Sequence, residues 1–210
     1  MGTIGSTNIG ESKQLLAEEV FHHIGRQIID GTLAEGERIR DVDVAEELHV
    51  SRTPVREALQ RLERLGMVTM YPSRYTEVTA VTSETIAQSL EFAGYQAGIA
   101  ARLAVPRMTS AQREHALRLT TAMHVALDDG TTTSSARWAV FAYLGEHSGN
   151  TQHRTLIEDT SMVLHRNLRD WAVPTSDRGR MGQVYEEFLD AVRVGDGEAA
   201  ERLVRAMYYL

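Results

Sequence analysis

The sequence predicts a mostly α-helical protein that begins with a winged helix-turn-helix, made of three helices and a small β-hairpin wing, and continues as an all-α half of six helices. Three observations predict this fold class. Residues 42–65 hold two amphipathic helical patterns joined by a short turn, and residues 67–81 hold two β-branched and aromatic runs joined by another. From Ser83 onward, helical patterns follow one another without a strand pattern.

The length of 210 residues suits two domains, because one domain commonly takes about 100–200 residues. We expect a disordered N-terminal tip at residues 1–10, a winged helix-turn-helix at residues 11–81 and a helical domain at residues 82–210. No repeat of fixed period appears, so a solenoid is not expected.

The helix expected at residues 52–65 has one apolar face and one charged face. Pro54 fits its first turn, where backbone N–H groups have no partner within the helix, and Gly66 supplies a C-terminal stop. Arg52 and Arg56 remain on the outer face. The apolar residues recur at spacings of three and four, as one buried helical face requires; they are Val55, Ala58, Leu59, Leu62 and Leu65.

A shorter amphipathic helix is expected at Val42–Leu48, and His49–Ser51 connects it to the longer one. This order is typical of a helix-turn-helix, whose second helix enters the major groove of DNA with its N-terminus first. The alternative is an ordinary amphipathic helix with a solvated charged face. The runs Met67–Tyr71 and Thr76–Val81 favour DNA binding, because the turn Pro72–Tyr75 joins them into a hairpin that would serve as the wing.

Residues 15–81 resemble the winged-helix domain of the GntR family of bacterial transcription regulators. Two departures are visible, because the family usually has a glycine where His49 stands and another in the wing turn at Arg74–Tyr75. These departures concern the shape of the turn and the wing. The motifs that carry the resemblance are, in order, Ile28–Leu33, Gly36–Ile39, Val44–Leu48, Ser51–Leu59 and Leu62–Val68.

The net charge of −7 argues superficially against a polyanionic partner, but its distribution matters more than the total. Residues 50–76 contain five arginines and two glutamates, a local excess of +3. This modest excess predicts few phosphate contacts per subunit, and hence a need for dimerisation, because each neutralised phosphate adds to the counterion-release contribution. Arg61 and Arg64 lie too far along the helix to reach base edges, so we interpret them as a solvated face.

Within the second helix, Arg52 and Arg56 are the candidates for reading guanine, because a guanidinium matches the O6 and N7 acceptors. Ser51 and Thr53 are expected to fix the register on phosphates. The GntR resemblance implies contact roles for Arg52, Thr53 and Arg56. Arg74 would lie at the wing tip, near the minor groove or the backbone.

The second half resembles the FCD effector domain of the FadR-like branch of GntR regulators, an antiparallel helical bundle that pairs subunits and holds a small ligand. The resemblance rests on Ser148–Asn150 after an aromatic helix and on Asp190–Asp196 before an Ala-rich last helix. Thr82 and Thr151 are among the residues placed to cap a following helix. Six helices are expected between breaks at Val105–Arg107, Asp128–Gly130, Ser148–Asn150, Val173–Thr175 and Gly195–Gly197.

Many FCD domains hold a divalent metal through one Asp and three His, and the resemblance implies where these ligands would stand. The Asp position falls at Arg137, and the three His positions fall at Phe141, Tyr185 and Met207. A guanidinium and a phenyl ring offer no lone pair, and a thioether is too soft for most such ions. We therefore expect no family-type metal and no other cofactor.

These replacements leave two interpretations of the site open. In the first, Phe141, Tyr185, Met207 and Trp138 line a pocket for an apolar or acyl-bearing effector, and Arg137 binds its acidic end. In the second, the same side chains fill the former site as core and Arg137 points outward.

Several classes of protein are not supported. The chain has no cysteine, no apolar run of the about 18 residues that a membrane span needs, and no secretory signal at its start, so we expect a cytoplasmic protein with no membrane partner. Its eight histidines are scattered along the sequence, so we expect no metal site formed by them. No nucleophile elbow, phosphate-binding loop or His-Glu-x-x-His motif is present, so we do not expect an enzyme.

These observations predict a sequence-specific DNA-binding transcription regulator that binds a short inverted repeat as a homodimer. The expected partners are a double-stranded DNA operator and a small-molecule effector, such as an acyl or organic acid, and the expected behaviour is repression that the effector lifts. The alternative is a ligand-independent DNA-binding protein whose helical domain only dimerises.

Overall fold

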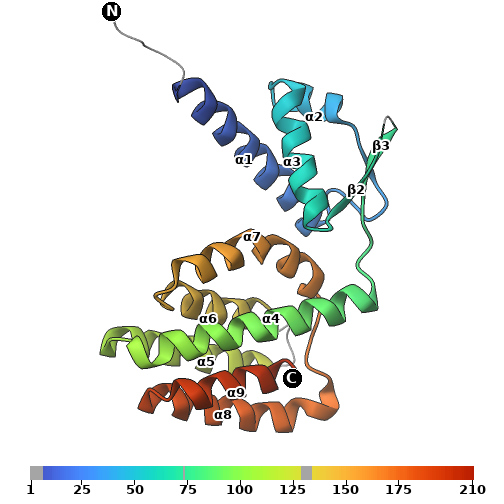
Figure 1. The fold of residues 1–210 in the computed structure, drawn as a ribbon. Helices are drawn as coiled ribbons and strands as arrows, with labels where there is room; N and C mark the ends of the chain where they lie inside the picture. Colours follow the sequence, from blue (N-terminus) through green and yellow to red (C-terminus); the bar gives the residue numbers. More distant parts are fainter. Residues whose placement is uncertain (1–6, 73, 129–133) are drawn as a thin grey trace, which may run out of the picture. The chain divides into compact units, whose positions relative to one another are not determined.

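The computed structural model describes residues 7–72, 74–128 and 134–210, and the side chains of residues 14–72, 74–127 and 134–210 (Figure 1). The chain divides into two compact units, and the division falls between Val81 and Thr82. Each unit has its own core and is described by itself.

The first unit contains the helices α1 (Thr7–Asp30), α2 (Asp41–Glu47) and α3 (Arg52–Arg64). The predicted apolar face of α3 is buried and packs against α1. The disordered tip expected at residues 1–10 lies in part outside the described residues. Its last four residues are helical, because α1 begins at Thr7.

The wing is a three-stranded antiparallel sheet in the order β1-β3-β2, with strands β1 (Arg38–Ile39), β2 (Val68–Tyr71) and β3 (Tyr75–Val78). The predicted hairpin β2–β3 is present, with Val68 opposite Val78 and Tyr71 opposite Tyr75. The sequence did not predict β1, which adds a short strand to the other edge of β3. The glycine between α3 and β2, Gly66, has φ 73°, a left-handed conformation that favours glycine.

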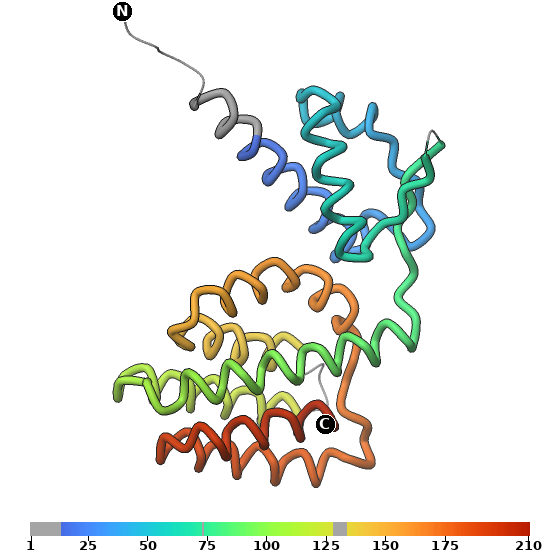
Figure 2. The backbone as a smooth tube through the Cα atoms, viewed as in Figure 1, coloured from blue at the N-terminus to red at the C-terminus, as the bar shows by residue number. Residues whose placement is uncertain are grey.

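The second unit contains, among the described residues, the six predicted helices. They pack as a bundle in which α4 contacts α6, α7 and α9, while α5 contacts α6 and α8. Figure 2 shows α8 and α9 side by side, joined by a tight turn. The helices are α4 (Ser83–Ala104), α5 (Ser110–Asp128), α6 (Ser134–Glu146), α7 (Thr151–Leu168), α8 (Arg178–Val194) and α9 (Gly197–Met207), and two short 3-10 turns are η1 (Val105–Arg107) and η2 (Thr175–Asp177).

Side-chain caps set several of these helix starts. Thr82 caps α4, because its hydroxyl accepts the Thr85 N–H while the Thr85 hydroxyl accepts the Thr82 N–H. Asn150 caps α7 through its side-chain oxygen, so the expected cap Thr151 is instead the first helical residue. Asp196 caps α9 by accepting two backbone N–H groups. Each cap satisfies donors that have no partner within the helix.

Small residues on α4 allow the C-terminal segment to approach closely. A Cβ atom on Gly94 would lie 2.7 Å from Cβ of Tyr208 and 2.7 Å from Cδ1 of Leu210. Ala97, Ala101 and other small α4 side chains are buried in the same core. Tyr208 is therefore held against α4 with its ring inside the bundle.

Candidate DNA interface and effector cavity

The first turn of α3 presents the predicted DNA-contacting side chains to solvent. Ser51 occupies the N-cap position with extended backbone, and its hydroxyl makes no capping hydrogen bond. Arg52, Thr53 and Arg56 are exposed, with 53% of the Arg52 side chain and 60% of the Arg56 side chain accessible. The start of α3 therefore offers two guanidinium groups, two hydroxyls and the N–H groups of its first turn to a partner.

Asp41, which sequence reasoning missed, binds both of these arginines. The Asp41 carboxylate accepts hydrogen bonds from Nη2 of Arg52 at 2.9 and 3.1 Å and from Nε of Arg56 at 2.7 Å. Partial burial of Asp41 raises its pKa, but the hydrogen bonds and charges of Arg56 and Arg52 outweigh this effect and hold the pKa below its ordinary value of 3.8. Asp41, in the first turn of α2, thus orients both arginines. We call these three side chains the Asp41 clasp.

The turn between α2 and α3 contains the first departure from the family pattern. His49 has φ 53°, in the left-handed region that favours glycine. The turn is closed by the N–H of Val50, which donates to the carbonyl of Ala45 at 3.0 Å. His49 therefore adopts the backbone conformation that a glycine adopts with less strain.

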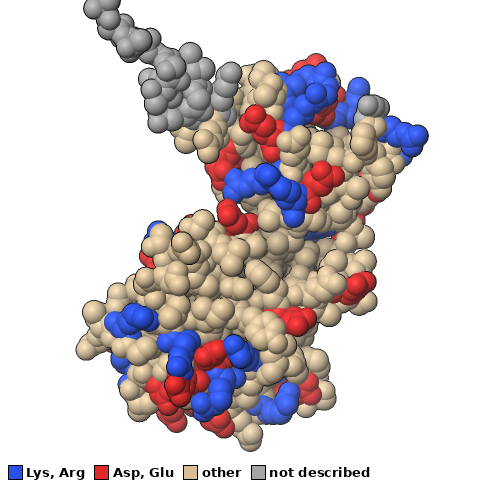
Figure 3. All heavy atoms as spheres, viewed as in Figure 1, with Lys and Arg blue, Asp and Glu red and all other residues tan. Residues whose placement is uncertain are grey.

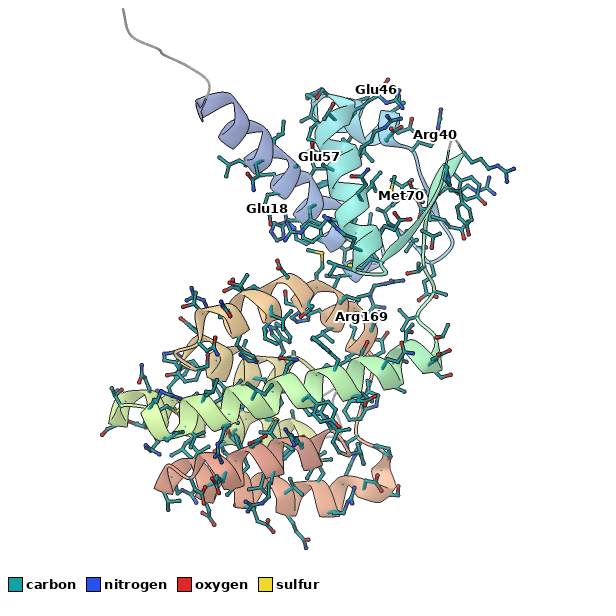
Figure 4. All side chains as sticks on the ribbon, in the orientation of Figure 1. Glu18, Arg40, Glu46, Glu57, Met70 and Arg169 are labelled. Carbon is teal, nitrogen blue, oxygen red and sulfur yellow. The ribbon has the colours of Figure 1, made fainter. Side chains whose placement is uncertain are left out.

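Further basic side chains lie on and beside the wing. Arg74 is exposed in the β2–β3 turn, and the Arg38 guanidinium lies 4.0 Å from the centre of the Tyr75 ring. Arg40, which precedes α2, pairs with Asp43 at 3.5 Å and has 71% of its side chain exposed (Figure 4). Figure 3 shows basic groups where Figure 1 places α2, the start of α3 and the wing tip. The sequence analysis had not singled out Arg38 or Arg40.

Arg61 differs from its interpretation as part of a solvated face. Its guanidinium pairs with Glu18 of α1 and lies 4.0 Å from the centre of the Phe21 ring, so it ties α3 to α1. Only 30% of its side chain is exposed. Arg64 is exposed, as the solvated face requires.

A cavity of about 70 Å³ lies within the second unit. Residues of α4, α6 and α7 line it, together with Trp171 after α7 and Tyr208 after α9, and most of these residues are apolar or aromatic. Three of the residues expected in an effector pocket, Arg137, Trp138 and Phe141, are among them. This is a site built inside one helical bundle.

Arg137 is buried, with 3% of its surface exposed, so it does not point outward. Its Nη2 donates a hydrogen bond to the Met207 carbonyl at 3.0 Å. The guanidinium carbon lies 4.1 Å from the centre of the Tyr208 ring and 4.6 Å from that of Trp171. Nη1 is buried with no hydrogen-bond partner among the described residues. A buried cation thus retains an unused donor beside the cavity.

Tyr185 and Met207 lie close to this group but are not among the cavity-lining residues, which corrects the expectation that they face an effector. Both are fully buried in the core, and Met207 contributes its backbone carbonyl to Arg137. Burial raises the pKa of the Tyr185 hydroxyl, and the charge of Arg137 opposes that rise. That hydroxyl has no hydrogen-bond partner among the described residues.

The lining residues that sequence reasoning missed include three with rings: His165, Trp171 and Tyr208. His165 lies against Trp138, with 4.4 Å between ring centres, and burial lowers its pKa below 6.5. The imidazole is therefore neutral at pH 7. Trp171 and Tyr208 are aromatic, which was the available signal, but in the structure they lie just beyond the ends of α7 and α9, where helical periodicity no longer says which way a side chain faces.

The residues that the resemblance implies for the metal positions do not suit a divalent ion, because Arg137 brings a positive charge and Phe141 has no donor atom. Among the described residues, no group of three or more His, Cys, Asp or Glu side chains is placed to hold a metal ion. Within the same residues, no helix is long and apolar enough to cross a membrane.

Two family models match the chain. The model described as bacterial regulatory proteins, gntR family, matches residues 16–78, which include the whole of α2, α3 and the wing. The FCD domain model matches residues 97–209, more than half of the chain.

Similar curated proteins include two named transcription regulators. The chain is 38% identical over 74 residues to an Nta operon transcriptional regulator of Aminobacter aminovorans, a match covering 35% of each protein. It is 30% identical over 93 residues to a probable D-xylose utilization operon transcriptional repressor of Paenarthrobacter nicotinovorans, covering 44% of this chain and 41% of that protein. The matched segments thus span less than half the length of these relatives.

Solved structures share the fold over nearly the whole chain. McbR/YncC of E. coli aligns with a TM-score of 0.66 and 21% identity, covering 92% of this chain and 93% of that one. A putative GntR transcriptional regulator from Rhodococcus sp. RHA1 aligns with a TM-score of 0.64 and 23% identity over the same shares. These structures show the shared fold, and the two family models show that the chain belongs to the GntR family of bacterial regulatory proteins, in the branch with a C-terminal FCD domain.

Proposed function

We propose that this DNA-binding regulator reads a short inverted repeat as a homodimer and responds to a small-molecule effector. The observation that carries the DNA-reading part is the Asp41 clasp at the exposed start of α3. Arg56 uses Nε to bind Asp41, which leaves its two terminal nitrogens to form the fork that matches O6 and N7 of guanine. Each such arginine contributes about 1–3 kcal/mol of discrimination between bases.

The homodimer is proposed from the electrostatics of one winged-helix unit. Residues 50–76 carry an excess of +3, which supports only a few phosphate contacts. Two subunits double those contacts and present two copies of α3, so the operator would be an inverted repeat whose half-sites follow the dimer's symmetry. The helical unit would supply the pairing.

The effector is proposed to be an organic or acyl-bearing acid in the cavity beside Arg137. The buried guanidinium with an unused donor supports this proposal. We further propose that effector binding lifts repression and that no family-type metal takes part. We also propose that the chain catalyses no reaction and acts in the cytoplasm, where bacterial DNA lies. One relative bears the name of a probable repressor, which agrees with the proposal that the DNA-bound protein represses transcription.

Selection of duplexes from a random library by the purified chain tests the DNA-reading proposal. We expect an enriched inverted repeat containing guanine, and loss of that enrichment in Arg56→Ala. Arg64→Ala is the matched control, because Arg64 is an exposed arginine at the other end of α3. Equal losses of specific and non-specific affinity in Arg56→Ala would remove Arg56 as a base reader.

A further inference from the structure

The cavity contains one permanent positive charge with an unused hydrogen-bond donor. Buried polar groups are nearly always paired, and a buried cation that lacks a partner is costly. Arg137 already binds the Met207 carbonyl through Nη2 and lies against two aromatic rings. Nη1, on the edge of the guanidinium, is the atom that remains for an anion.

The rest of the lining limits the charge and polarity of a ligand. Arg137 is the only Arg or Lys among the described lining residues. His165 is held neutral by burial, and the Ser134 hydroxyl already donates to the Leu168 carbonyl at 2.6 Å. The surface between them is formed largely by Trp138, Phe141 and aliphatic side chains. A ligand with one negative charge and an apolar body matches this lining.

The volume limits the size of the ligand. The cavity of about 70 Å³ is several times the about 10–15 Å³ that one water requires, and about half of the roughly 150 Å³ of an engineered cavity that binds benzene. Space continues beside Gly145, where an added Cβ would meet no atom within 4 Å. The site therefore suits a compact molecule rather than a long acyl chain.

We propose that the effector is a compact monocarboxylate with an apolar body, whose carboxylate binds Nη1 of Arg137 and whose body lies against Trp138 and Phe141. This inference rests on the proposed effector role of the helical unit and specifies its ligand class. A dicarboxylate is disfavoured, because its second charge would be buried in a largely apolar site with no second cation among the described lining residues. A neutral amide of the same shape is disfavoured, because it leaves the guanidinium without a counter-ion.

Calorimetry and thermal shift on the full chain at pH 7.5 test this proposal with butyrate as the probe. Succinate serves as the dicarboxylate and butyramide as the neutral analogue. We expect saturable binding of butyrate, with affinities for succinate and butyramide at least about tenfold lower. Equal affinity for butyrate and either analogue would overturn the proposal.

Two variants test separately whether butyrate binding depends on the charge of Arg137 and on the space in the cavity. Arg137→Met removes the guanidinium while keeping a long apolar side chain, and we expect it to lower butyrate affinity at least about tenfold. Gly145→Leu fills part of the cavity without altering Arg137, and we expect it to weaken butyrate binding too. Gly179→Leu, on the exposed surface of α8, is the matched control and should leave butyrate affinity unchanged. Wild-type affinity in Arg137→Met or Gly145→Leu would place butyrate elsewhere.

Measuring DNA affinity in the same samples distinguishes this inference from the function on which it rests. Operator binding without butyrate binding contradicts the ligand class and leaves the DNA-reading proposal intact. Butyrate binding at Arg137 that leaves operator affinity unchanged supports the site but contradicts its role as an effector site.

Discussion

Replacing Asp41 by asparagine tests whether the Asp41 clasp prepares α3 for reading bases. Asn keeps the shape of the side chain but removes the charge that both arginines share. More than half of the Arg52 and Arg56 side chains is exposed, so solvent weakens each ion pair to about 0.2–1 kcal/mol. We expect Asp41→Asn to lower the free energy of unfolding by about 0.4–2 kcal/mol, the sum of two such pairs.

The larger effect of Asp41→Asn is expected on DNA selectivity. Without Asp41 the two guanidinium groups move freely, so binding to bases must order them and loses conformational entropy. Removing a negative charge near the phosphates strengthens binding to DNA of any sequence. Specific affinity should fall, non-specific affinity should rise slightly, and their ratio should drop about five- to tenfold, or about 1–1.4 kcal/mol. Fluorescence anisotropy with the selected duplex and a scrambled one, at two salt concentrations, measures this ratio. An unchanged ratio would refute the orienting role of Asp41.

The pH dependence of stability checks the same contact. Because the pKa of Asp41 is held below 3.8 in the folded protein, the stabilisation is complete above that value and is lost as the pH falls through the lowered pKa. The difference in stability between wild type and Asp41→Asn should therefore be present at pH 7 and disappear in this acidic range. Chemical denaturation across pH measures the difference, and a gap that persists below the lowered pKa would contradict the assignment.

Three further variants test the packing. Gly94→Ala should lose about 1–3 kcal/mol of stability, since its new Cβ would meet Tyr208 at 2.7 Å, and a melt like that of the exposed control Gly179→Ala would contradict this close approach. Arg61→Ala should destabilise the winged-helix unit by about 1 kcal/mol in denaturant unfolding without changing base preference; altered selectivity would make Arg61 a DNA contact. Ligand-free Arg137→Met should melt no lower than wild type, since it removes a buried charge with an unused donor, and a clear drop in Tm would show that the guanidinium is a structural group.

The fold class followed from periodicity, because long helices and a hairpin repeat their apolar residues often enough to be recognised. The predicted α3 face, from Val55 to Leu62, is buried as its spacing required. Strand β1 was missed because its two residues, Arg38 and Ile39, are too few to show alternation.

The sites were predictable only in part, because they depend on contacts between elements. Asp41 and Arg56 lie on different helices, and no local pattern indicates that a carboxylate of one orients an arginine of the other. Tyr208 and Trp171 line the cavity from just beyond the ends of α9 and α7, where the chain leaves the helix and periodicity no longer places a side chain. Arg137 was singled out through the family resemblance, while its burial is a property of the packed bundle.

The most direct measurement is the affinity of the purified chain for its selected duplex, titrated with butyrate. A ligand-responsive regulator predicts that the apparent Kd rises by about 5- to 150-fold at saturation, which corresponds to a coupling of about 1–3 kcal/mol, and that Arg137→Met shows no such rise. An operator affinity that stays constant while butyrate saturates the protein would contradict the proposed coupling between the cavity and DNA binding.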